Sequence, residues 1–480
     1  MKTRILLIIS IAGLLFTGCS LDQKPQTSWT DGAFYETSGQ VEGLLEGAYV
    51  KLETALGAGF MVYGDMRSDL YTCYNQNSVV YLNIMENVIT PYNANASWAN
   101  FYAAIQQANL VIKNAPAMYE AGILDETQFA RIIGEAYCLR AFTYFWIVRI
   151  WRDAPLVVEP SVASDYNARI KKSTEGELLS QIHSDLETSR QYLTDSGNRT
   201  HFTLSGSWAV SAQVCAWEKD WDGVLEACAN VNSKTYELAK LYDENETVGS
   251  LTFMQTIANS QYASIFNDGK SSESIFELSF SLEDSSDSKL LNGLVYQNEV
   301  LHPHPELLSH YKTLKNDDWR YYINFYDERK VTKYFIDFTG IANETRNVVL
   351  LRYADIVLLK AEAQIEKAAL IGGDMGNALL QQAVVGINTI RKRAGGPTYI
   401  LPATYTVENI DDIRTVIADE RKIEFYGEGY RYFDLMRTGK VTEVMPPING
   451  QEDVRSIYWP VYYTEVIYSN GSIEQNEYYK

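Results

Sequence analysis

Apolar residues recur at the spacing of an α-helix over most of this chain. In residues 125–150, one face of the predicted helix carries Phe129, Ile132, Ile133, Ala136, Tyr137, Tyr144, Phe145 and Val148. The sequence Asp125-x-x-Gln128 before this face is typical of a capping box at a helix start. Thr174-x-x-Glu177 precedes a second such stripe, made of Leu178, Leu179, Ile182, Leu186 and Leu193. The pattern predicts long amphipathic helices.

A helix pair is predicted in residues 204–232, with a turn around Asp220 to Asp222. Its small residues, Ala209, Ala212, Ala216, Ala227 and Ala229, allow two helices to approach closely, as in tetratricopeptide-like hairpins. A strict repeat of about 34 residues is not visible. Further helices are predicted in residues 351–369 and 413–440. The fold class we expect is therefore mainly α, built on tetratricopeptide-like helical pairs.

Two segments lack a helical pattern. Residues 243–300 are rich in polar and small residues and contain the β-leaning sequence SESIFELSFS, and residues 457–480 are aromatic and extended in character. Long loops in a compact protein are commonly functional. We expect an N-terminal helical region at 31–240 and a C-terminal region at 241–480, which together form one compact body with long irregular loops.

The first residues have the layout of a secretory signal. Lys2 and Arg4 precede an almost wholly apolar run, Ile5–Phe16, which is too short to cross a bilayer. Small residues followed at once by Cys19 resemble a bacterial lipobox, although Phe16 stands where leucine is commonest. We expect a signal peptide at 1–18, acylation of Cys19 as a membrane anchor, and a lipidated tether at 19–30. The alternative is an ordinary signal whose cleavage site contains a cysteine.

The composition indicates which classes of partner are expected. Lys and Arg number 41 against 61 Asp and Glu, and without Lys2 and Arg4 the net charge becomes −22, so nucleic acid is not an expected partner. The four cysteines after Cys19 show no CxxC pairing, and buried free thiols are expected for them. The 34 tyrosines against 17 phenylalanines suit a recognition surface or wet helix packing equally well.

Enzyme motifs are missing from the sequence. It contains no HExxH, GxSxG, GxGxxG or P-loop. The histidines of LHPHPELLSHY could share a metal, but surface loop residues are the simpler interpretation. Glu420, Glu424 and Glu428 could supply glycosidase carboxylates, but they are interleaved with Arg421, Lys422 and Arg431, and a salt-bridged helix end is favoured. Arg140 interrupts an apolar face, and we expect it to be buried and paired with a carboxylate.

The stretch ERKIEFYGEGYRYFDLMRTGK resembles the C-terminal signature of the SusD/RagB family, surface lipoproteins of Bacteroidota that capture glycans or peptides for a TonB-dependent outer-membrane transporter. The matching residues are Glu420, Arg421, Glu424, Gly429, Arg431, Asp434, Leu435, Arg437 and Gly439. WANFYAAIQQANLVI, GEAYCLRAFTYFWIVRIWRDAPLV, LRYADIVLLKAEA and the end from Trp459-Pro460 to Gln475-Asn476 are also similar to the family, in the same order. Arg152 and Glu477 depart from the usual glycine and proline.

The resemblance implies a scaffold of four tetratricopeptide-like helix pairs, with ligand carried by irregular loops. It also implies a non-enzymatic, cell-surface glycan-binding lipoprotein of the outer membrane, which delivers oligosaccharide to a partner SusC-like TonB-dependent transporter. No cofactor is expected, and a structural ion in a loop is left open. A peptide-capturing protein, a surface glycosidase and a purely structural partner of the transporter remain alternatives.

Candidate ligand-binding residues follow from position, because the matched motifs belong to the scaffold. Sugar rings stack on aromatic faces while amides bond their hydroxyl groups. The segment between the early helices and the loop-rich middle supply such side chains: Tyr71, Tyr74, Asn75, Tyr81, Tyr262 and Tyr296.

Overall fold

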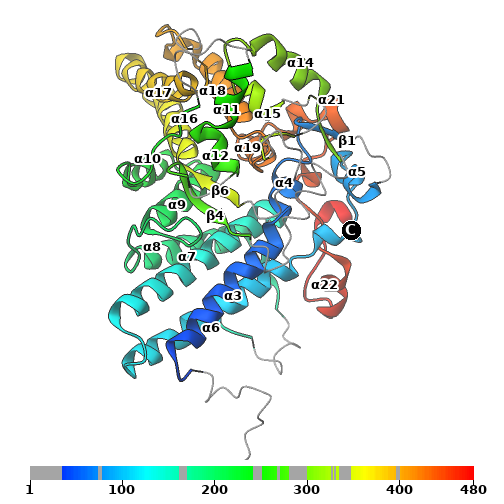
Figure 1. The fold of residues 1–480 in the computed structure, drawn as a ribbon. Coiled ribbons are helices and arrows are strands. Elements are labelled where there is room, and N and C mark those ends of the chain that lie inside the picture. Colours follow the sequence, from blue (N-terminus) through cyan, green and yellow to red (C-terminus); the bar gives the residue numbers. More distant parts are fainter. Residues whose placement is uncertain are drawn as a thin grey trace, which may run out of the picture.

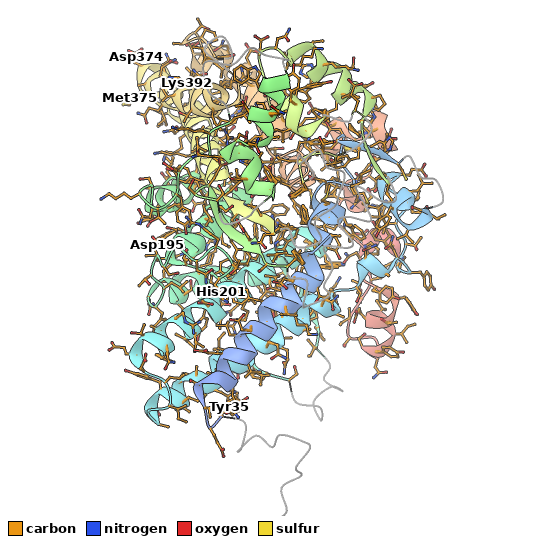
Figure 2. All side chains as sticks on the ribbon, in the orientation of Figure 1. Tyr35, Asp195, His201, Asp374, Met375 and Lys392 are labelled. Atoms are coloured by element: carbon orange, nitrogen blue, oxygen red, sulfur yellow. The ribbon has the colours of Figure 1, made fainter. Side chains whose placement is uncertain are left out.

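The computed structural model describes most of the chain and is dominated by α-helices (Figure 1). The described residues are 35–73, 78–161, 170–241, 251–267, 271–280, 300–325, 328, 331–334, 347–395 and 400–480. Tyr35 lies at one end of the molecule, and Asp374 and Met375 lie at the other (Figure 2).

Long antiparallel helices form the N-terminal part, as the apolar stripes predict. They are α3 (Ser38–Leu56), α6 (Ala99–Glu120), α7 (Glu126–Trp151) and α8 (Glu175–Arg190) (Figure 1). Both predicted capping boxes are present: Asp125 accepts a hydrogen bond from the Gln128 amide at 2.8 Å, and Thr174 accepts one from the Glu177 amide at 3.3 Å. The amphipathic pattern therefore predicted these helices and their starts correctly.

Arg140 fastens three of these helices together from within. Its Nε and Nη2 donate to the Asp185 carboxylate at 2.8 and 2.7 Å, and its Nη1 donates to Asn109 Oδ1 at 2.7 Å. Arg140 and Asp185 are almost completely buried. The bidentate geometry offsets the cost of removing both charges from water. The expectation of a buried arginine paired with a carboxylate is confirmed.

A second group of helices continues the stack. It consists of α9 (Leu204–Glu218), α10 (Trp221–Asn230), α16 (Tyr353–Ile371), α17 (Gly373–Ala394) and α18 (Ile410–Glu424). The predicted α9–α10 hairpin turns at Lys219, whose φ is 61°, and Asp220 caps α10 by accepting from the Gly223 amide at 3.1 Å. Helices α16 and α17 approach closely at Gly386, where an added Cβ would lie 3.3 Å from the Ala361 Cβ.

Short antiparallel strand pairs connect the helices. They are β1 (Tyr71–Cys73) with β5 (Leu301–Pro303), β2 (Ala154–Pro155) with β3 (Lys172–Ser173), and β4 (Ser274–Leu278) with β6 (Val348–Arg352). Strand β4 is the β-leaning part of SESIFELSFS, and both β4 and β6 are wholly buried. Burial on both faces explains why β6 reads as a continuous apolar run.

Shorter helical elements fill the remaining described chain. They are α4 (Gly59–Gly64), α5 (Val79–Met85), η1 (Ala94–Ala96), α11 (Leu251–Ala258), α12 (Gln261–Asn267), α14 (Pro305–Leu314), α15 (Tyr321–Asn324), η4 (Val407–Asn409), α19 (Arg431–Arg437), α20 (Val441–Val444), α21 (Pro446–Asn449), η5 (Val454–Ser456), α22 (Tyr463–Tyr468) and η6 (Glu477–Tyr479). Helices α11, α12 and α22 correct the expectation that 243–300 and 457–480 lack helix. One or two turns are too short to display a clear period.

The predicted helix over 413–440 is in fact two helices. The chain leaves α18 after Glu424 and begins α19 at Arg431, with Gly427 and Gly429 at φ of 79° and 80°. A Cβ on Gly429 would lie 2.5 Å from the Phe60 carbonyl oxygen, so this turn requires glycine for its φ and for its close contact with α4.

The largest hydrophobic cluster runs from Val41 to Val461 and contains residues of both halves, and a second cluster lies between α16, α17 and α18. The division into regions at 31–240 and 241–480 that form one compact body stays a prediction. Among the described residues, no helix has the length and apolar content needed to span a bilayer.

Candidate functional site

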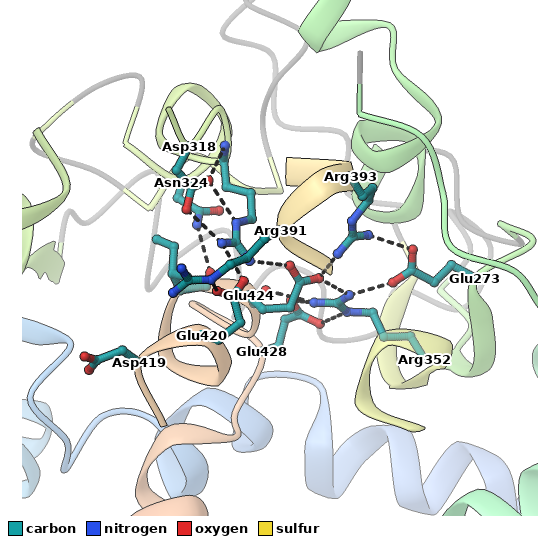
Figure 3. A network of polar contacts seen from close by, with 12 residues as sticks. Glu273, Asp318, Asn324, Arg352, Arg391, Arg393, Asp419, Glu420, Glu424 and Glu428 are labelled. Carbon is teal, nitrogen blue, oxygen red and sulfur yellow. Dashed lines mark hydrogen bonds and ion pairs between the residues drawn. The ribbon is translucent and has the colours of Figure 1, made fainter. Parts of the chain in front are cut away.

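The three glutamates that could have served a glycosidase lie inside the protein. Glu420 and Glu424 come from α18 and Glu428 from the turn after it, and each is at most 2 % exposed. Arg320 donates to Glu424 at 2.7 Å. Arg352 donates to Glu424 at 2.5 Å and to Glu428 at 2.6 Å (Figure 3). These carboxylates are held in ion pairs.

These three glutamates belong to a larger group of buried charged residues around Glu424, which we call the buried charge network. Its other members are Glu273, Asp318, Arg320, Lys333, Arg352, Arg391, Arg393, Glu420 and Glu428. Burial alone would raise the pKa of Glu424, but Arg393, Arg352 and Arg320 outweigh this effect and hold the pKa well below its usual range. The Glu424 carboxylate is therefore ionised and structural.

The interpretation of a salt-bridged helix end is confirmed, but the partners differ from those adjacent in sequence. Arg421 binds Asp355 at 2.8 Å and Asp434 at 2.9 Å. Lys422 and Arg431 both bind Asp69, at 2.5 and 2.7 Å. Neighbouring charges on a helix point to different faces, so each face of α18 finds its own partners in the tertiary structure.

Two of the predicted ligand-binding residues are core residues, which corrects their assignment. Tyr71 in β1 is 3 % exposed and packs 5.3 Å from the Tyr426 ring. Tyr262 in α12 is fully buried, with the Arg393 guanidinium 4.6 Å from its ring centroid. Neither ring has a free face on which a sugar could stack. The sequence shows an aromatic residue in a polar context but not the depth at which it lies.

The remaining predicted site residues are either partly exposed or outside the described residues. Tyr81 lies on α5, is partly exposed, and has a pKa raised by burial. Tyr74, Asn75, Tyr296 and Cys19 lie outside the described residues, so their assignments stay predictions. Cys138, Cys215 and Cys228 are buried free thiols, as expected, and Cys73 is partly buried and is not in a disulfide. Within the described ranges, no three potential metal-ligating side chains come together.

Tyrosine rings gather instead on a surface that the sequence does not single out. Tyr92 and Tyr463 have ring centroids 4.9 Å apart at 37°, and Tyr462 lies 4.8 Å from Tyr463. Tyr92 is 73 % exposed, and the other two rings are partly exposed. We call these three residues the tyrosine surface. The only signal for it in the sequence is the aromatic density of the C-terminal segment.

Hydrogen bonds from distant segments hold the tyrosine surface in place. The Tyr463 amide donates to the Pro91 carbonyl at 3.0 Å, and Ser97 Oγ donates to Glu465 at 3.1 Å. Before α22, the Trp459 amide donates to the Ile150 carbonyl at 2.9 Å. Helix α22 is thereby fixed at the edge of the molecule, beside the segment that carries Tyr92 (Figure 1).

The residues of the C-terminal signature act as a scaffold in this geometry: most are in ion pairs, Gly429 is in the tight turn between α18 and α19, and Leu435 is buried in an apolar cluster. A family model described as "SusD family" matches residues 191–479, well over half of the chain. The chain belongs to the SusD family. A second model, described as "Starch-binding associating with outer membrane", matches residues 21–216, so that the two SusD models together span nearly the whole chain. The resemblance stated from the sequence is confirmed.

Individual SusD proteins agree with this assignment. A SusD-like protein of Formosa agariphila is 27 % identical over 510 residues, covering 98 % of this chain and 97 % of its own. A SusD superfamily structure from Bacteroides vulgatus has a TM-score of 0.75 at 20 % identity and covers 92 % of this chain and 99 % of its own. A structure from the same species, titled as a putative sugar binding protein, has a TM-score of 0.73 at 20 % identity, with coverages of 92 % and 99 %. The expected helical SusD-like fold is confirmed.

We predict that Glu424→Gln lowers the free energy of unfolding at neutral pH by about 3–5 kcal/mol, because it leaves buried guanidinium groups without their counter-charge. The wild-type carboxylate has a folded pKa far below its unfolded value, so its contribution is present above about pH 4.3 and is lost as the pH falls toward the folded pKa. The variant should therefore lose less stability than wild type on acidification. Urea unfolding at several pH values measures both effects.

Glu443→Gln is the matched control, because Glu443 is 66 % exposed and pairs only with Lys440 on the surface. It should unfold like wild type. Equal stability of wild type and Glu424→Gln at neutral pH would contradict the structural role of the buried charge network.

Proposed function

We propose that this SusD family protein is a non-enzymatic, cell-surface glycan-binding lipoprotein that captures oligosaccharide and passes it to a SusC-like TonB-dependent transporter. The observation that carries the binding step is the tyrosine surface, in which three neighbouring rings are exposed or partly exposed. Family membership and the starch-binding description of one matching model support the choice of sugar as ligand.

The chemistry of the tyrosine surface suits a neutral sugar. An aromatic face gives the apolar C–H side of a pyranose ring a contact that requires no charge, and the phenol hydroxyl can donate to or accept from sugar hydroxyls. Two rings inclined at 37° present a bent surface rather than a flat one. Such a surface favours a curved or branched chain over a straight one.

Residues outside the three rings extend this proposal. Tyr81 is partly exposed, and Tyr74, Asn75 and Tyr296 remain proposed ligand contacts on the strength of their chemistry and sequence position. The proposal of a binding protein without catalysis is supported by the glutamates of α18, which are held by arginines. It does not depend on a cofactor.

Membrane attachment is proposed through an acylated Cys19, with residues 19–30 as a tether. The lipobox-like sequence supports it, and the second family model carries an outer-membrane description. Acyl chains in a bilayer anchor a protein stably only when more than one is attached, as bacterial lipoprotein processing provides.

We predict that the protein binds neutral oligosaccharides in calorimetric titrations and that Tyr92→Ala and Tyr463→Ala each weaken binding by about 5–10-fold, the equivalent of one stacking contact. Phenylalanine at either position should keep most of the affinity, because it keeps the ring face. Tyr119→Ala is the matched control: Tyr119 is 40 % exposed and stacks on Phe129 at 4.6 Å. Wild-type affinity in the Tyr92→Ala/Tyr463→Ala double variant would contradict the site. If the wild-type protein bound peptides but no oligosaccharide, the result would favour peptide capture.

For the anchor, we predict that a radiolabelled fatty acid labels the wild-type protein in cells and that Cys19→Ala abolishes the label, because the thiol is the acylated group. Cys73→Ala is the control, since Cys73 is the partly buried thiol of β1 and should leave labelling unchanged. Equal labelling of wild type and Cys19→Ala would refute the anchor.

For the partner, we predict that the full-length protein, purified by affinity from detergent-solubilised outer membranes, retains a TonB-dependent transporter. The tether holds the folded body close to the membrane, which raises its effective concentration near such a partner. The opposite outcome is that the protein purifies without a transporter at every detergent concentration that preserves native membrane complexes. This outcome would count against delivery to a transporter.

A further inference from the structure

Arg149 is a buried arginine with unsatisfied hydrogen-bond donors. It lies near the end of α7 and is 7 % exposed, and its Nε and Nη2 have no hydrogen-bond partner within the described part of the chain. Arg140, Arg320 and Arg352, which are buried to a similar degree, each bind carboxylates. A buried guanidinium whose N–H groups have neither a carboxylate nor another acceptor is costly, so Arg149 requires a physical explanation.

Aromatic rings surround the Arg149 guanidinium but do not supply acceptors for its in-plane N–H groups. Its central carbon lies 4.4 Å from the Phe145 ring centroid, 4.2 Å from that of Trp146 and 4.5 Å from that of Phe433. Cation–π contact stabilises the charge through the ring faces. The N–H groups in the guanidinium plane still need acceptors. The buried indole Nε1 of Trp146 also has no partner.

Two adjoining cavities lie against these unsatisfied donors. Arg149 lines both, and Trp146 lines the smaller one. Their volumes are about 20 and 10 Å³, roughly the room that one water-sized body requires. The cavities lie where α7 and α9 of the N-terminal half meet α16, α18 and α19 of the C-terminal half. An occupant would therefore contact both halves of the molecule.

The carboxylates near these cavities are already committed to other groups. Asp355 accepts from Arg421 and Gln213, both at 2.8 Å. Asp434 accepts from Arg421 and Arg437, while Glu362 binds Arg437 from outside the cavity. Glu428, on the smaller cavity, binds Arg352 and Lys333.

The walls of the larger cavity thus carry three guanidinium groups against two carboxylates. Of those three, only Arg149 lacks an anionic contact. Burial lowers the pKa of Arg149 to about 9 in spite of Asp355 and Asp434 nearby, which agrees with a charge that these carboxylates do not neutralise.

We propose that a small monovalent anion of the chloride class binds between Arg149 and Trp146. Such an ion accepts several N–H donors at once, fits a water-sized space and supplies the missing negative charge at the guanidinium edge. Water could accept the same hydrogen bonds but would leave the cation uncompensated. Larger oxyanions and sugars exceed the available volume. The site is structural, joins the two halves of the fold and does not depend on the proposed glycan binding.

The test compares thermal unfolding in sodium chloride, sodium bromide and sodium methanesulfonate at equal ionic strength. Wild type should unfold about 1–3 °C higher in the halides, because methanesulfonate is too large for the cavity and an ion bound only to the folded state stabilises it. Arg149→Met keeps an apolar stem among the rings and should lose this difference. Arg67→Met is the control, since the Nη1 and Nη2 of Arg67 already have acceptors on Asn87, Ser456 and Ile457.

Chloride NMR line width measures the ion directly. Wild type should broaden the chloride signal, bromide should reverse the broadening, and Arg149→Met should not broaden it. Trp146→Phe keeps an aromatic face and removes one donor, so it should weaken chloride binding by about 5–10-fold even if Arg149→Met does not fold. Absence of both halide stabilisation and line broadening in wild type would overturn the proposal and assign the cavities to water.

Discussion

Burying the carboxylate of Glu424 is the constraint on which the rest of the structure depends. An ionised group removed from water must be surrounded by counter-charges, and here these come from Arg320, Arg352 and Arg393, which lie 104, 72 and 31 residues away in sequence. Meeting this requirement fixes α15, β6, α17 and α18 relative to one another. Any arrangement that misplaced one of these elements would leave an unpaired charge in the interior, which is strongly destabilising.

The buried arginines differ in how their charge is compensated. Where an acid is available, as for Arg140 with Asp185, the pair is closed and fastens helices together. Where none is available, as for Arg149, aromatic faces carry part of the charge and the N–H groups open onto a small cavity. The Arg140 pair joins helices of the scaffold to one another, and Arg149 is where we propose that an anion supplies the missing acceptor.

The tyrosine surface depends on contacts with the packed helices, although it lies at the edge of the molecule. The C-terminal segment is bound to the end of α7, where Trp151 Nε1 donates to the Pro460 carbonyl at 3.0 Å. The Gln475 side chain binds both backbone groups of Val461: it accepts from the amide and donates to the carbonyl, each at 2.7 Å. These contacts position α22 against Tyr92. A recognition surface is thus built from loops and short helices whose ends are held by the packed helices.

The sequence by itself determined the helices with strong periodicity, their capping boxes, the buried role of Arg140 and the membership of the family, because these features are local or depend on ordered motifs. The sequence did not determine how deeply each side chain is buried. Tyr71 and Tyr262 have the chemistry of ligand contacts but lie in the core. Tyr463 lies in a segment without helical pattern, and the sequence did not single it out. Which arginine meets which acid, which ring is exposed and which cation stays unpaired were decided by the tertiary structure alone. They depend on contacts between residues far apart in sequence, and no local pattern records them.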